Sequence, residues 1–156
     1  MNQDISYLTL ADRKLAYQQR NASPESAGKA GIIFLGGFAS DMDGTKANFL
    51  DEKTTQAGQS YLRFDYRGHG LSSDKFEDGC IGDWADDALK IFDSVTKGPQ
   101  LLVGSSMGGW IGLLLARARP DRIAGFVGIA AAPDFTRELI IPSLTQDQKA
   151  SLEEDR

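Results

Sequence analysis

Residues 101–110 have the sequence LLVGSSMGGW, and this stretch decides the fold of the chain. Residues 104–108 (GSSMG) match the pattern G-x-S-x-G. The apolar residues Leu101–Val103 before the motif indicate a buried strand, and the apolar run that begins at Trp110 is typical of a helix. A strand that passes into a helix through two glycines turns sharply, and the middle residue of the motif lies at the tip of that turn.

Ser106, the middle residue of the motif, is our candidate for a catalytic nucleophile. A sharp strand-to-helix turn holds its central residue in a sparsely populated backbone conformation and pushes the side chain outward. The hydroxyl then lies near a helix N-terminus, where unsatisfied N–H groups and a partial positive charge favour a developing oxyanion. We therefore predict Ser106 as the nucleophile and the main-chain N–H of Met107 as one donor of an oxyanion hole. The alternative is a glycine-rich turn that carries no chemistry.

A second oxyanion donor is expected from the turn after the third predicted strand. Residues 35–40 follow there with the sequence LGGFAS. Glycines let the backbone bend so that a main-chain N–H points into a site. We predict the N–H of Phe38 as this donor, with Gly37 as the second choice, and the Phe38 ring as a candidate wall of an acyl pocket. The alternative is that the glycines serve only the steric needs of a turn.

Strand-like and helix-like segments alternate along the rest of the chain. A turn at Ala11–Arg13 joins the first two strand-like pieces into a hairpin. This order predicts an α/β fold with a mainly parallel sheet, helices on both faces and an entry through the hairpin. The predicted strands are Ile5–Leu10, Lys14–Gln19, Gly31–Leu35, Tyr61–Asp65, Leu101–Val103 and Ile123–Ile129, and the predicted helices are Thr45–Ala57, Asp83–Thr96, Trp110–Ala118 and a further helix beginning in Asp134–Ile140.

Composition narrows the possible functions. The chain has 156 residues and a net charge of −5, which fits one domain and argues against nucleic acid as a partner, because no Lys/Arg stripe neutralises phosphates. The apolar stretches are too short to span a bilayer. One cysteine, Cys80, rules out an internal disulfide, and one histidine with one cysteine is too few for a metal site. We expect a cytoplasmic protein that needs no cofactor and acts on a small-molecule ester or acylated substrate; the oligomeric state stays open.

Five stretches of the chain carry a resemblance to known proteins: Phe34–Gly44 (FLGGFASDMDG), Arg63–Gly70 (RFDYRGHG), Ile81–Trp84 (IGDW), Gly98–Trp110 (GPQLLVGSSMGGW) and Ala118–Arg122 (ARPDR). The chain resembles the α/β-hydrolase superfamily over its whole length. These stretches are closer still to the family of α/β-hydrolase domain protein ten, which contains acyl-protein thioesterases and acyl-glucuronide esterases that are mitochondrial in animals. The resemblance implies a Ser–Asp–His triad with Ser106 as nucleophile, oxyanion donors at Phe38 and Met107, and hydrolysis of esters or thioesters through an acyl-enzyme.

The chain departs from the superfamily pattern after its sixth predicted strand. Superfamily members continue through a cap and two further strands that carry the triad acid and histidine, whereas this chain stops at Arg156. We expect residues 1–138 to be the N-terminal part of an α/β-hydrolase core, truncated after about six strands, and residues 139–156 to begin the cap. Ile123–Ile129 is then an open apolar edge. The chain is expected to be a fragment of a longer serine esterase or thioesterase and to be inactive by itself.

The other titratable candidates are assigned structural roles. His69, the one histidine, precedes Ser106, whereas the triad histidine of this superfamily follows the acid, so we interpret residues 65–72 as a loop scaffold. Asp134 is a minor candidate for the triad acid and is interpreted as a helix cap, and Asp83 and Asp121 as caps or surface charges. Two rival hypotheses stay open: a non-catalytic module that binds a ligand or partner, and a short active form with His69 as its base.

Overall fold

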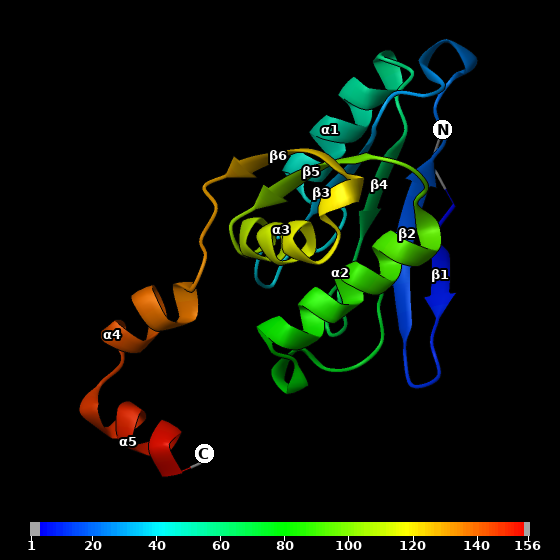
Figure 1. Ribbon diagram of the computed structural model, residues 1–156. Coiled ribbons are helices and arrows are strands. Elements are labelled where there is room, and N and C mark those ends of the chain that lie inside the picture. Colours follow the sequence, from blue (N-terminus) through cyan, green and yellow to red (C-terminus); the bar gives the residue numbers. More distant parts are fainter. Residues whose placement is uncertain (1–3, 155–156) are drawn as a thin grey trace.

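The computed structural model describes residues 4–154, and within this range six strands form one sheet (Figure 1). The strands are β1 (Ser6–Thr9), β2 (Lys14–Arg20), β3 (Gly31–Leu35), β4 (Tyr61–Phe64), β5 (Gln100–Ser105) and β6 (Ile123–Ile129), in the spatial order β1-β2-β4-β3-β5-β6. β1 and β2 form the predicted antiparallel hairpin, and β2 also pairs antiparallel with β4. The other neighbours pair in parallel, so the predicted mainly parallel sheet is confirmed.

Helices cover both faces of the sheet, as the sequence predicted (Figure 1). The helices are α1 (Thr45–Gln56), α2 (Ile81–Val95), α3 (Met107–Ala118), α4 (Ile141–Ser143) and α5 (Gln146–Glu154), with the short helical turns η1 (Pro24–Ser26), η2 (Phe76–Asp78), η3 (Pro120–Arg122) and η4 (Thr136–Ile140). Helix α1 packs on one face of the sheet, and helices α2 and α3 pack on the opposite face.

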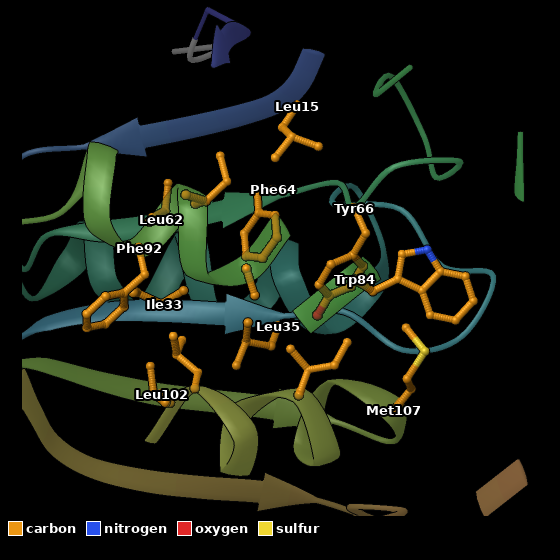
Figure 2. Close-up of a cluster of buried hydrophobic side chains, with 14 of the residues drawn as sticks. Leu15, Ile33, Leu35, Leu62, Phe64, Tyr66, Trp84, Phe92, Leu102 and Met107 are labelled. Carbon is orange, nitrogen blue, oxygen red and sulfur yellow. The ribbon is translucent and has the colours of Figure 1, made fainter. Parts of the chain in front are cut away.

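Alternation along β3 divides the core between the two faces of the sheet. Successive side chains of a strand point to opposite faces. Ile33 and Leu35 belong to the larger cluster with α2 and α3, whereas Phe34 belongs to the smaller cluster beneath α1. Figure 2 shows the larger cluster, in which Phe92 of α2 and Met107 of α3 are fully buried. The continuous apolar run of β3 is therefore explained by helices on both of its faces.

Two helices begin earlier than the sequence predicted, and each has a local cause. α2 begins at Ile81 because Cys80 and Asp83 form a capping box, in which the Asp83 carboxylate accepts the Cys80 N–H at 3.2 Å. α3 begins at Met107 instead of Trp110, so glycines occupy its first turn. Glycine is a weak helix former, and the sequence pattern therefore placed the start of this helix after the glycines.

The first turn of α3 lies directly on the ends of β3 and β5. A Cβ atom added to Gly108 would lie 2.0 Å from the carbonyl oxygen of Leu35, and one added to Gly104 would lie 2.4 Å from the carbonyl oxygen of Gly108. Both contacts are with main-chain atoms, which cannot move aside as a flexible side chain can. Both glycines of the motif are therefore needed to bring this helix N-terminus to the sheet edge where β5 ends.

We predict that Gly108→Ala lowers the free energy of unfolding by about 3 kcal/mol, because the added methyl group forces α3 away from β3. Gly82→Ala is the matched control, since Gly82 also lies in the first turn of a helix but its added Cβ would meet only the Cys80 sulfur, at 3.7 Å. This control is expected to raise the free energy of unfolding by about 0.5–1 kcal/mol. Urea unfolding measures both values, and equal effects of the two substitutions would contradict the close packing.

The sheet has an open edge at β6, which has no partner strand on its outer side within the described residues. Val127 of β6 is 47% exposed, as expected for an uncovered edge strand. The helix expected to begin in residues 134–140 starts at Thr136 as a π-helical turn, because Asp134 has a φ of 54°, outside the helical region. α4 and α5 then extend away from the sheet (Figure 1). The boundary between core and cap near residue 139 stays a prediction.

Candidate active site

Ser106 occupies the turn between β5 and α3 in a strained backbone conformation. Its φ is 54° and its ψ is −119°, a region that residues other than glycine rarely adopt. The turn is fixed on the side of β6, because the Ser106 N–H donates to the carbonyl of Ile129 at 3.0 Å and the Ser106 carbonyl accepts the N–H of Ala132 at 3.1 Å. The side chain of Ser106 is exposed, whereas that of Ser105 is buried. The turn therefore presents one hydroxyl to solvent at the end of the sheet.

Free main-chain N–H groups lie on two segments next to Ser106. Met107 is the first residue of α3, so its N–H has no acceptor within the helix. Within residues 4–154, the N–H groups of Gly37 and Phe38 also have no hydrogen-bond acceptor. A Cβ atom added to Gly37 would lie 3.4 Å from the Cβ of Ser106, so the loop that follows β3 contacts the serine directly. The structure thus places Gly37 against Ser106, with Phe38 next to Gly37 and Met107 next to Ser106 in the chain, and the catalytic roles of these residues stay predictions.

Asp65 joins the loop after β3 to the loop after β4. Its side chain is 2% exposed, and its two carboxylate oxygens accept the N–H of Met42 at 2.7 Å and the N–H of Leu71 at 2.9 Å. Burial raises the pKa of Asp65, the nearby charges of Asp41 and Asp43 raise it slightly further, and the two N–H donors only partly oppose this effect. The carboxyl is therefore a buried titratable group that holds the loop beside Ser106.

The raised pKa of Asp65 predicts a pH dependence of stability. The folded state binds this proton more tightly than the unfolded state, so the contribution of Asp65 to stability is present below the unfolded pKa of about 3.9 and is lost as the pH rises through the folded pKa. Asp65→Asn cannot titrate. We therefore expect the unfolding free energy of the wild type, relative to that of the variant, to fall in urea titrations as the pH rises above about 4. A difference that grows with pH would show that the pKa is lowered instead.

Aromatic rings form an apolar surface beside the loop that carries Phe38. The Phe38 ring is 43% exposed and makes edge contacts with Phe76, Trp84 and Phe135, with ring centroids 4.8 Å, 5.9 Å and 5.5 Å away. A cavity of about 170 Å³ lies on the other side of this loop, between Gly37 and α1. It is smaller than the roughly 300–1,000 Å³ of typical ligand pockets. The aromatic surface at Phe38 and this small cavity are what the described residues supply next to Gly37, and the Phe38 ring as a wall of an acyl pocket stays a prediction.

Residues 32–151 match the family model described as the alpha/beta hydrolase fold, which covers most of the chain and the site described above. The chain belongs to the α/β-hydrolase family.

Within the α/β-hydrolase family, the chain is similar to proteins named palmitoyl-protein thioesterase ABHD10, mitochondrial. The protein of Bos taurus is 43% identical over 132 residues, which cover 83% of this chain and 41% of the bovine protein, and that of Mus musculus is 39% identical over 142 residues, which cover 86% and 48%. The solved structure of alpha/beta hydrolase domain-containing protein 10 from mouse matches with a TM-score of 0.86 and 35% identity, over 97% of this chain and 59% of the mouse chain. The chain therefore corresponds to the N-terminal part of these relatives and spans less than half the length of the two curated proteins.

The expectation of a cytoplasmic location is wrong. The relatives from cattle, mouse and human are all named as mitochondrial proteins. The expectation rested partly on the single cysteine, which fits every compartment where thiols stay reduced and so does not distinguish between them. No helix of residues 4–154 is long and apolar enough to cross a membrane. In the same residues, no group of three or more His, Cys, Asp or Glu side chains is placed to hold a metal ion.

His69 of this α/β-hydrolase chain lies in an aromatic cage and does not contact Ser106. Its side chain is 4% exposed, and the ring centroids of Tyr66, Phe76 and Trp84 lie 5.5 Å, 5.1 Å and 5.2 Å away. The His69 Nδ1 atom faces the carbonyl oxygen of Arg67 at 3.0 Å, so this nitrogen carries the proton. Within the described range, the Ser106 hydroxyl has no hydrogen-bond partner. The contacts of His69 are those of a packed loop residue.

The aspartates named from the sequence lie in three different settings. Asp83 belongs to the capping box of α2 and also forms an ion pair with Arg67 at 3.2 Å. Asp121 is exposed in the first turn of η3. Asp134 begins η4 through its main chain, because its carbonyl accepts the N–H groups of Arg137 and Glu138 at 3.0 Å and 2.9 Å. Asp134 thus lies at the start of the helical turn, as expected of a helix cap, but acts there through its carbonyl, because this turn has no hydrogen bond to a capping side chain.

Sequence reasoning missed the specific role of Asp65, which it included only in a loop scaffold. A carboxylate directly after the apolar strand residues of β4 was the available signal, because a charged side chain at the buried end of a central strand needs hydrogen-bond donors. The sequence does not show which donors these are. Met42 and Leu71 supply them from two different loops.

Proposed function

We propose that the full-length protein is a serine hydrolase that cleaves carboxylic esters or acyl thioesters through an acyl-enzyme on Ser106. The observation that carries this proposal is the strained, exposed Ser106 at the start of α3, beside the unpaired N–H groups of Met107 and Phe38. Backbone strain of this kind persists only where the surrounding structure enforces it, and it concentrates at catalytic sites. Membership of the α/β-hydrolase family supports the same reaction class.

In the proposed reaction, the Ser106 oxygen attacks the carbonyl carbon of the substrate. The carbonyl oxygen becomes an oxyanion, which the N–H groups of Phe38 and Met107 stabilise by hydrogen bonds. Collapse of this intermediate breaks the bond to the thiol or alcohol, which leaves with a proton, and the acyl group stays on Ser106. Water then attacks the acyl-enzyme and releases the carboxylic acid. Each step needs a base near the hydroxyl, and we assign this role to a histidine outside the 156 residues, because His69 does not contact Ser106.

Acyl thioesters with a long apolar chain are the proposed substrates. The relatives named as palmitoyl-protein thioesterases are about 40% identical to this chain and support this choice. The exposed ring of Phe38 and its contacts with Phe76 and Phe135 offer an apolar surface next to the proposed oxyanion hole. Burial of an acyl chain on such a surface is favoured by about 0.8 kcal/mol per methylene group. By the same relationship we propose that the protein acts in mitochondria.

A non-catalytic binding module is the second candidate. It is favoured by the absence of any hydrogen-bond partner of the Ser106 hydroxyl among residues 4–154. A serine without a base is a poor nucleophile, although the apolar surface beside it can still bind an acyl group. This candidate expects acyl ligands to bind the full-length protein without turnover.

Ser106→Ala is expected to abolish labelling of the full-length protein by a fluorophosphonate probe and to lower kcat for a palmitoyl thioester by up to about 10⁶-fold. Ser105→Ala is the matched control, because it removes a neighbouring hydroxyl that is buried and points away from solvent. We expect this control to retain labelling and turnover.

Labelling that survives in Ser106→Ala would refute the assignment of the nucleophile. A full-length wild type that binds the acyl ligand but shows neither labelling nor turnover would favour the binding module.

A further inference from the structure

The segment directly after β4 holds the loop between β3 and α1, residues 36–44, which carries the proposed donor Phe38. The Tyr66 hydroxyl donates to the carbonyl oxygen of Gly36 at 3.3 Å, and the Asp65 carboxylate accepts the N–H of Met42 at 2.7 Å. The first bond lies before Phe38 in the loop, and the second lies after it. In Figure 2 the Tyr66 hydroxyl points toward the end of β3, where this loop begins. The loop is therefore fixed on both sides of Phe38.

The bond from Tyr66 restrains the peptide group between Gly36 and Gly37, whose N–H has no hydrogen-bond acceptor within residues 4–154. The carbonyl of Gly36 and the N–H of Gly37 belong to one rigid peptide plane, so a donor that fixes the carbonyl also fixes the direction of that N–H. The next peptide group in the chain carries the N–H of Phe38. Glycine has the widest range of backbone conformations, and a loop that begins with two glycines has little stiffness of its own. The Tyr66 hydroxyl adds a hydrogen-bond restraint at the start of this loop.

Tyr66 is itself held in place and is suited to act as a permanent donor. Its side chain is 1% exposed, and its ring packs against Phe64 and His69 at centroid distances of 5.0 Å and 5.5 Å. Burial raises the pKa of Tyr66, so the hydroxyl keeps its proton throughout the neutral range. The ring does not reach the exposed surface where Ser106 lies, so its effect on the site passes through the main chain of Gly36.

We propose that Tyr66 is a positioning residue that orients the peptide groups of Gly37 and Phe38 for the oxyanion, with Asp65 holding the far side of the same loop. This inference rests on the proposed function. An oxyanion hole is effective only when its donors are already aimed at the place where negative charge develops. Loss of the Tyr66 hydroxyl therefore weakens stabilisation of the transition state more than binding of the substrate.

Tyr66→Phe and Tyr61→Phe form a matched pair for the test in the full-length protein. Tyr61 is also 1% exposed and lies at the start of β4, the strand that Tyr66 closely follows, and its hydroxyl donates to the carbonyl of Ala47 in α1 at 2.9 Å. Both variants lose one buried hydroxyl that bonds a main-chain carbonyl, but only Tyr66 bonds the loop that carries Phe38. We expect Tyr66→Phe to lower kcat for a palmitoyl thioester by roughly 10- to 100-fold with an unchanged KM, and Tyr61→Phe to leave both constants unchanged.

Two further measurements separate positioning from a general loss of structure. The inhibition constant of a long-chain trifluoromethyl ketone, which forms an oxyanion on the attacking serine, is expected to rise in Tyr66→Phe by the same factor by which kcat falls. Order parameters from ¹⁵N relaxation at Gly37 and Phe38 are expected to fall in Tyr66→Phe and to stay at about 0.85 in Tyr61→Phe.

Equal kinetic effects of the two substitutions, or order parameters that do not change in Tyr66→Phe, would overturn the positioning role. Failure of the proposed function gives a different result, namely turnover that persists in Ser106→Ala. If the wild type shows no turnover but the order parameters fall as expected, the restraint of the loop stands and its catalytic purpose is refuted.

Discussion

The close approach of α3 to the ends of β3 and β5 is the constraint on which the rest of the molecule depends. Gly104 and Gly108 leave no room for a Cβ atom, and this absence lets a helix N-terminus meet the edge of a parallel sheet. Ser106 lies between these two glycines and is held in a strained backbone conformation, with a φ of 54°. Hydrogen bonds to Ile129 and Ala132 hold it there. Packing, strain and exposure of one hydroxyl are thus three results of the same contact.

Much of the fold follows from local patterns in the sequence. The bounds of β3 and β6 agree with the predicted strands, because apolar runs between glycines and polar turns need no distant information. The start of α3 was placed too late, since weak helix formers in its first turn are retained for packing, which overrides helix propensity. The helical turn after β6 begins at Thr136, inside the expected range, and follows a residue with a left-handed backbone, Asp134. Propensity predicts a helix reliably only where tertiary contacts do not impose a different geometry.

Some residues of the candidate site could also be located from local sequence patterns, and others could not. Ser106, Met107 and the Gly37–Phe38 pair could be located from the sequence because each belongs to a turn whose shape follows from its own residues. The loop contacts of Asp65 and Tyr66 could not be predicted, because they depend on strand order. β4 lies beside β3 in the sheet although α1 separates the two in the chain, and the contacts with Gly36 and Met42 exist only through that neighbourhood. A pattern read along one chain contains no such pairing.

In the proposed function, Phe38 makes two chemically separate contributions. Its main-chain N–H is a proposed oxyanion donor, whereas its ring contacts the aromatic rings of Phe76, Trp84 and Phe135. The N–H belongs to the backbone and is retained by every amino acid except proline. Evolution can therefore exchange the side chain at this position and alter which acyl group fits, while the donor remains in place. A fold that separates recognition from chemistry within a single residue has a simple route to new substrates.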